Sequence, residues 1–119
     1  MKKITLILLT FIVALMLAQN TLTTEIKPKR EIVLENEQVQ VVRLTYPAGT
    51  ESGMHTHAFA HRVVYFVKGG TLTLIPQDTT KKSVKLQAND GQTLFLPATT
   101  HNVRNTGNSE IIIVETELK

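Results

Sequence analysis

Short apolar or alternating stretches, separated by turn residues, run through most of the chain. Residues 71–75 alternate cleanly and place Leu72 and Leu74 on one face, as a strand requires. Other runs have the β-branched and aromatic content typical of strands: residues 32–34, 39–46, 63–67, 83–87, 92–96, 101–105 and 111–114. No segment after residue 18 shows a helical apolar period. About eight to ten short strands at this spacing predict an all-β sandwich or barrel.

The first 18 residues have a different character. Lys2 and Lys3 precede a mostly apolar run that ends at Ala18, which is typical of a secretory signal peptide. A retained membrane anchor is the alternative, although spanning helices need about 20 apolar residues. We therefore expect a periplasmic or secreted protein whose mature chain begins near Gln19. Contact with the membrane is then expected only through the precursor's signal segment.

Charge and composition narrow the remaining possibilities. The sequence has 13 basic and 10 acidic side chains, and removal of residues 1–18 leaves 11 (13 − 2) and 10. No basic run remains to favour a nucleic-acid partner. The absence of cysteine excludes disulfides and thiolate metal ligands. Residues 19–31 are predicted to form a polar N-terminal arm, and residues 32–119 a single domain.

Histidines supply the candidate chemistry. His55 and His57 are two residues apart, so on a strand both side chains project from the same face. Two imidazoles so placed can converge on one metal ion. His101 lies in a second strand-like stretch and is a candidate third ligand. The remaining histidine, His61, lies close to the pair in sequence.

These residues resemble the two motifs of the cupin superfamily, G-x5-H-x-H-x3,4-E-x6-G and G-x5-P-x-G-x2-H-x3-N. The positions that match are Gly49, His55, His57 and Gly69 in the first motif, and Gly91, Pro97, His101 and Asn105 in the second. Thr99 replaces the second motif's glycine, and one residue fewer precedes its histidine. The resemblance covers about residues 44–105. It implies a small double-stranded β-helix barrel, jelly-roll-like, with the site inside its mouth, and a homodimer formed through strand edges and N-terminal arms.

The resemblance also implies a divalent transition metal on His55, His57 and His101. Three neutral imidazoles suit Zn, Fe, Mn, Ni or Cu and leave positions open for water or substrate. The alternative is a metal-free cavity lined by hydrogen-bonded histidines. Asn105 is expected behind these ligands, where it satisfies strand backbone rather than substrate.

The chain departs from the family at the glutamate of the first motif. Counting back from Gly69 places Arg62 at that position, whereas the shorter spacing from His57 places His61 there. Strand alternation points Arg62 into the cavity and His61 outward, but residue 61 adjoins a turn. His61 therefore remains a candidate fourth ligand or a rim residue.

Two roles for Arg62 stay open. It pairs with a buried carboxylate such as Glu51 or Glu115, or it binds the carboxylate or phosphate of a ligand with its planar guanidinium. Without a motif carboxylate, we expect the cavity to be positive and to prefer anions. On that basis Arg62→Glu is expected to tighten metal binding and to weaken anion binding.

Three functions fit these observations. The first is a metal-dependent oxygenase or isomerase that acts on a small, anionic molecule. The second is a non-catalytic periplasmic binding protein for a small ligand or a metal ion. The third is a structural or assembly role with an empty barrel.

Overall fold

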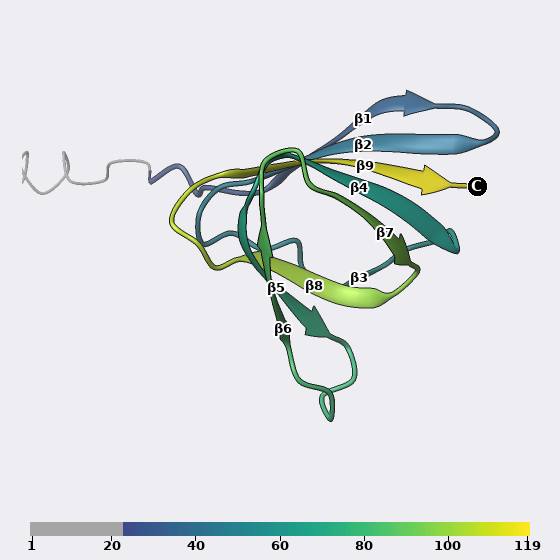
Figure 1. Cartoon of the computed structure of the whole chain (residues 1–119). Helices are drawn as coiled ribbons and strands as arrows, with labels where there is room; N and C mark the ends of the chain where they lie inside the picture. Colours follow the sequence, from purple (N-terminus) through teal and green to yellow (C-terminus); the bar gives the residue numbers. More distant parts are fainter. Residues whose placement is uncertain (1–22) are drawn as a thin grey trace, which may run out of the picture.

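Two antiparallel sheets face each other in the computed structural model, which describes residues 23–119 (Figure 1). One sheet has the order β1-β2-β9-β4-β7 and the other β3-β8-β5-β6. The strands are β1 (Lys29–Glu35), β2 (Val39–Tyr46), β3 (His55–Thr56), β4 (His61–Lys68), β5 (Gly70–Pro76), β6 (Val84–Ala88), β7 (Thr93–Pro97), β8 (Thr100–Asn105) and β9 (Ile111–Leu118). The prediction of an all-β barrel of eight to ten strands is confirmed.

The first strand starts earlier than predicted. β1 begins at Lys29, inside the expected polar arm of residues 19–31, because Lys29 and Arg30 pair with Thr45 and Leu44 near the end of β2. The predicted signal peptide, residues 1–18, lies outside the described residues. Within residues 23–119, no helix is long and apolar enough to cross a membrane.

The inward-facing side chains of β4 and β9 are apolar at one end of each strand and charged at the other. The two strands pair antiparallel, with Phe66 opposite Ile113 and Arg62 opposite Glu117. Phe66 and Ile113 belong to the buried apolar cluster at one end of the barrel. The charged positions face the same interior at the other end, where they help to form the site.

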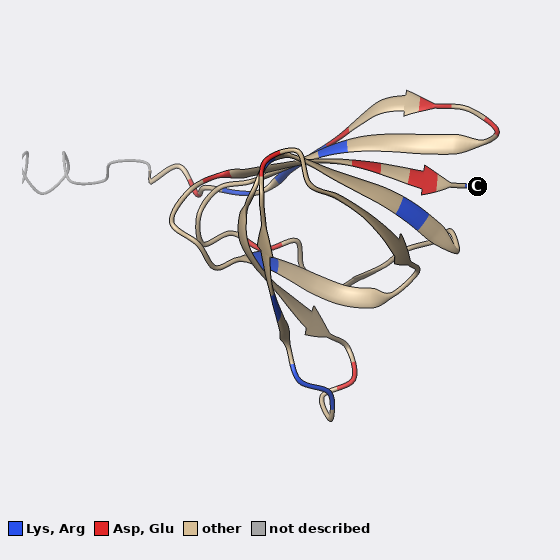
Figure 2. Ribbon diagram, in the orientation of Figure 1, with Lys and Arg blue, Asp and Glu red and all other residues tan. Residues whose placement is uncertain are grey.

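The last strand is longer than predicted. The expected strand ended at Val114, but β9 continues to Leu118 and buries both Glu115 and Glu117. Its burial alternates strictly from Ile111 onward, so the two glutamates share the inward face of the isoleucines. Figure 2 shows these acidic bands of β9 beside a basic band on β4.

Two motif glycines occupy positions that other residues tolerate poorly. Gly49 has a φ of +78°, in the left-handed region, within the turn that follows β2. A Cβ atom on Gly69 would lie 2.3 Å from the carbonyl oxygen of Ala88. A side chain on Gly69 would therefore push the connection between β4 and β5 away from the end of β6.

Candidate metal centre

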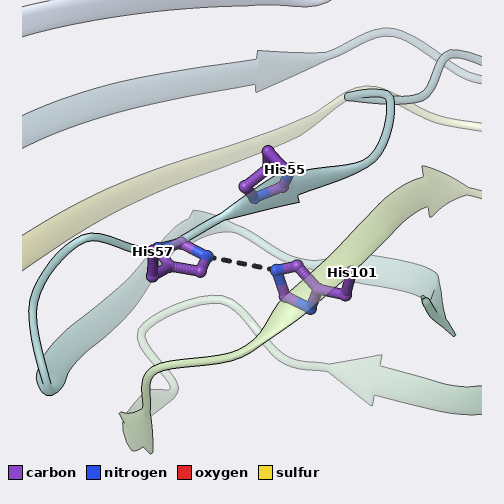
Figure 3. Close-up of side chains that lie close together, drawn as sticks. All are labelled: His55, His57 and His101. Carbon is purple, nitrogen blue, oxygen red and sulfur yellow. Dashed lines mark hydrogen bonds between the residues drawn. The ribbon is translucent and has the colours of Figure 1, made fainter. Parts of the chain in front are cut away.

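His55, His57 and His101 converge inside the mouth of the barrel (Figure 3). The short strand β3 pairs with β8 so that His55 lies directly opposite His101, and His57 follows β3 immediately. One ring nitrogen from each histidine lies within 4.8 Å of the other two. The structure thus brings together the three histidines that the sequence singled out.

The spacing of His57 and His101 suits two ligands of one ion. Their Nε2 atoms are 3.1 Å apart. Two nitrogens bound to a single metal at about 2.1 Å are roughly 3.0–3.4 Å apart for bond angles of roughly 90–109°. Only a small rearrangement is therefore needed for both rings to coordinate one ion.

Hydrogen bonds on the opposite ring nitrogens fix which atoms of His55 and His57 face the centre. The Nδ1 atom of His55 is 3.0 Å from the carbonyl oxygen of Gly53, which can only accept, so Nδ1 carries the proton. The Nδ1 atom of His57 donates to Glu117 Oε1 at 2.5 Å. In both neutral rings, Nε2 is left with a lone pair, the form that binds metals.

Burial keeps two of these rings neutral. It lowers the pKa of His101 to about 4, and electrostatic interaction with nearby His55, Arg62 and His57 acts in the same direction. Burial is also the largest cause of the lowered pKa of His57, and the hydrogen bond that His57 donates to Glu117 opposes it. Near neutral pH neither ring carries the proton that would compete with a metal.

Carboxylates reach the site from β9 rather than from the cupin motif. Arg62 does face inward, as alternation predicted, and is 3% exposed. Its Nε donates to Glu115 Oε2 at 3.1 Å, and its Nη1 donates to the Pro97 carbonyl at 2.7 Å. The cavity therefore contains carboxylates that the motif does not supply, since Glu115 and Glu117 line it together with the cationic side chains of Lys29, Arg30 and Arg62.

The two glutamates differ in their surroundings. Burial raises the pKa of Glu115 to about 7; Arg62 opposes this shift and the neighbouring Glu117 carboxylate adds to it. Glu117 contacts His57 through Oε1, whereas its Oε2 is buried with no hydrogen-bond partner among the described residues. Glu117 was missed from the sequence, and its signal was the even spacing of Ile111, Ile113, Glu115 and Glu117.

The structure does not bring His61 and Asn105 to the three histidines. The His61 side chain is exposed on the outer face and stacks on Phe95, with ring centroids 5.2 Å apart. Asn105 is fully buried, and its side chain bonds only to backbone groups, those of Tyr46, Gly107 and Ser109. It holds together the loops at the apolar end of the barrel.

A cavity of about 350 Å³ opens beside the histidines. Its polar wall includes the three histidines, Arg62, Glu115 and Glu117, and Lys29 and Arg30 of β1 also line the cavity. Its apolar wall comes from both sheets and includes six leucines: Leu44, Leu72, Leu74, Leu86, Leu94 and Leu96. A small molecule with an apolar body and a polar head facing the histidines would match this division.

The chain is similar in sequence and in fold to several known proteins. The Beta-alanine degradation protein BauB of Pseudomonas aeruginosa is 33% identical over 89 residues, which cover 74% of this chain and 90% of that protein. A cupin domain from Bordetella pertussis is 31% identical, with a TM-score of 0.71 over 78% of this chain and 94% of that one. An RmlC-like cupin from Desulfovibrio desulfuricans, 20% identical with a TM-score of 0.54, shares the fold and covers 81% of this chain and 92% of its own. No protein-family model matches the chain.

Proposed function

Because this chain belongs to the cupin superfamily, we propose that it binds one divalent transition metal through His55, His57 and His101. The observation that carries the proposal is the convergence of the three rings, with two Nδ1 atoms held by acceptors. Such outer hydrogen bonds orient metal-binding histidines and increase their basicity. Three neutral nitrogen ligands suit Zn, Fe, Mn, Ni or Cu.

The buried charges also favour a cation here. Above its pKa of about 7 Glu115 is ionised, and it and the Glu117 carboxylate then carry two negative charges against the one positive charge of Arg62. These three side chains are nearly enclosed, so one negative charge is left without a partner in a region of low polarity. A divalent ion on the histidines would compensate that charge. The β9 carboxylates would then supply the negative charge that the motif's missing glutamate supplies in other cupins.

We propose that the site acts on one small, predominantly apolar molecule. The leucine-lined wall would hold its body, and its polar head would reach the open positions at the histidines. A bound ion would polarise a coordinated oxygen of that molecule, the chemistry that oxygenases and isomerases of this type require. The wall itself would orient the molecule and exclude water from the reacting atoms.

Arg62 bears on the charge of that molecule. Its Nε and Nη1 already donate to Glu115 and Pro97, so only the remaining N–H groups of the guanidinium are available to the carboxylate or phosphate of a ligand. A neutral or zwitterionic molecule therefore fits better than a simple anion. The name of the BauB relative refers to β-alanine degradation, which makes β-alanine a reasonable member of a test panel.

A non-catalytic binding protein is the second candidate. The observation that favours it is the replacement of the motif glutamate by Arg62, which removes a carboxylate that could coordinate the ion or act as a base. Turnover separates the two candidates. Incubation of metal-loaded protein with a panel of small oxygenated molecules, followed by mass spectrometry, detects a product only if the protein is an enzyme.

Export and dimerisation belong to the same proposal. The basic start and apolar run of residues 1–18 support delivery to the periplasm or the exterior. An exposed edge strand supports pairing with a second copy, because unpaired strand edges associate readily.

Metal analysis of protein purified from the exported fraction, without an affinity tag, tests the proposal. We expect near-stoichiometric transition metal in the natural protein and its loss from the His55→Ala/His57→Ala variant. His61→Ala is the matched control, because His61 lies on the outer face, and it should keep the metal. Unchanged metal content in the double variant would remove these histidines from the site.

A further inference from the structure

Glu117 has one carboxylate oxygen that the protein does not use. Its Oε1 accepts a hydrogen bond from His57 Nδ1, whereas Oε2 is buried and has no hydrogen-bond partner within residues 23–119. The residue is 6% exposed and lines the cavity. Buried carboxylate oxygens without a donor are costly and rare, so this one calls for a partner that enters from the cavity.

The neighbouring cation does not fill that role. Arg62 lies opposite Glu117 in the pairing of β4 with β9, but its Nε and Nη1 atoms donate to Glu115 and to the Pro97 carbonyl. His57 already donates to the other oxygen of Glu117. No hydrogen bond to the free oxygen is formed within residues 23–119, although the neighbouring Glu115 carboxyl can donate to Glu117 when it is protonated. Glu117 itself lies in the wall that contains the candidate ligands.

We propose that Glu117 Oε2 accepts a hydrogen bond from an N–H or O–H group of the bound molecule. The inference rests on the proposed function, because it places that donor next to the atom that faces the metal. It narrows the substrate class to small molecules with three parts: an oxygen that coordinates the ion, an adjacent hydroxyl or amino donor, and an apolar body. Carboxylates and phosphates that lack such a donor are excluded as preferred ligands.

Two matched probes test this contact. Benzohydroxamic acid offers chelating oxygens, an adjacent N–H and a phenyl ring, whereas N-methylbenzohydroxamic acid carries a methyl group in place of the N–H hydrogen. Titrated into the Co²⁺-loaded protein, the N–H compound should bind at least about tenfold more tightly, after correction for the affinities of both compounds for free Co²⁺. Glu117→Gln presents an amide N–H2 at the free position and should abolish this preference. Glu35→Gln, an exposed glutamate on β1 with a hydrogen-bonded carboxylate, should leave it unchanged.

The outcomes distinguish the two proposals. Co²⁺ affinity is measured first in each variant, and failure of the natural protein to bind Co²⁺ contradicts the metal site alone. In that case the two hydroxamic acids are titrated into the metal-free protein. Tighter binding of the N–H compound, lost in the Glu117→Gln variant, still supports the contact. The contact is refuted if the natural protein shows no preference, if Glu117→Gln keeps it, or if neither probe binds with or without Co²⁺.

Discussion

Arg62→Met removes the buried cation that stands where cupins carry a glutamate. Methionine keeps most of the side-chain length and removes the guanidinium. Arg62 and Glu115 are 3% and 8% exposed, and their ion pair is 3.1 Å long. The substitution leaves the Glu115 carboxylate and the Pro97 carbonyl without their donors.

Breaking one partner of a buried ion pair costs about 3–5 kcal/mol. For a domain of this size, even about 3 kcal/mol lowers the melting temperature by roughly 12–24 °C. Typical folding free energies of about 5–15 kcal/mol mean that the variant can still fold, with a narrow margin. Arg62→Glu, which the sequence alone suggested would supply a metal ligand, should cost more, because it places a third carboxylate beside Glu115 and Glu117.

The pH dependence gives the sharper test. In the folded metal-free protein the pKa of Glu115 is about 7, above its ordinary value of 4.5. A raised carboxyl pKa makes the fold less stable as pH rises from 4.5 to 7, by about 3 kcal/mol for this shift. Loss of Arg62 removes a positive charge that lowers this pKa, so the pKa rises above 7 in the variant. The part of the variant's loss of unfolding free energy that is due to Glu115 should therefore be small at pH 6 and should grow as pH rises through 7.

Chemical denaturation in the presence of a chelator at pH 6 and pH 9 measures both effects. The double variant Arg62→Met/Glu115→Leu is the control, because an apolar pair of similar volume removes the stranded charge and should recover most of the stability. A single variant as stable as the natural protein at pH 9 would refute the buried-pair reasoning. A deficit of equal size at both pH values would refute the role assigned to the Glu115 charge.

Three further expectations follow from the same structure. Asn105→Ala should lose about 2–4 kcal/mol in denaturation, because three backbone groups lose a buried partner, and a simultaneous loss of metal would contradict its purely structural role. Mass spectrometry of the exported protein should find a mature start near Gln19, and an intact residue 1 in the membrane fraction would favour an anchor. Sedimentation should give a dimer that Val33→Lys on β1 converts to a monomer, since Val33 is 57% exposed on an edge strand; a dimer that survives this change uses another surface.

Alternation along single strands carried most of what the sequence could predict. It placed His55 and His57 on one face, Arg62 inward and His61 outward, because the barrel has a dry interior and the period of a strand is two. It could not state which carboxylate Arg62 would meet. That partner comes from a strand 53 residues away, and only the pairing of β4 with β9 brings the two together.

The end of β9 shows why the rest was out of reach. Glu115 and Glu117 have weak strand propensity, so the local pattern ended the predicted strand at Val114. Pairing with β2 on one side and β4 on the other extends it to Leu118. The start of β1 at Lys29 has the same cause, since charged residues are acceptable on an exposed edge that already has one partner strand.

The contact between His57 and Glu117 joins the two sheets at the open end of the barrel. His57 follows a strand of one sheet, and Glu117 belongs to the other. A metal ion on the three histidines would hold the His57 ring in the orientation that contacts Glu117, and binding to the folded state would raise the free energy of unfolding with the logarithm of the free metal concentration. In an environment poor in metal, the same mouth would open more often and expose the chain to proteases. The lifetime of the protein would then report the supply of the proposed metal.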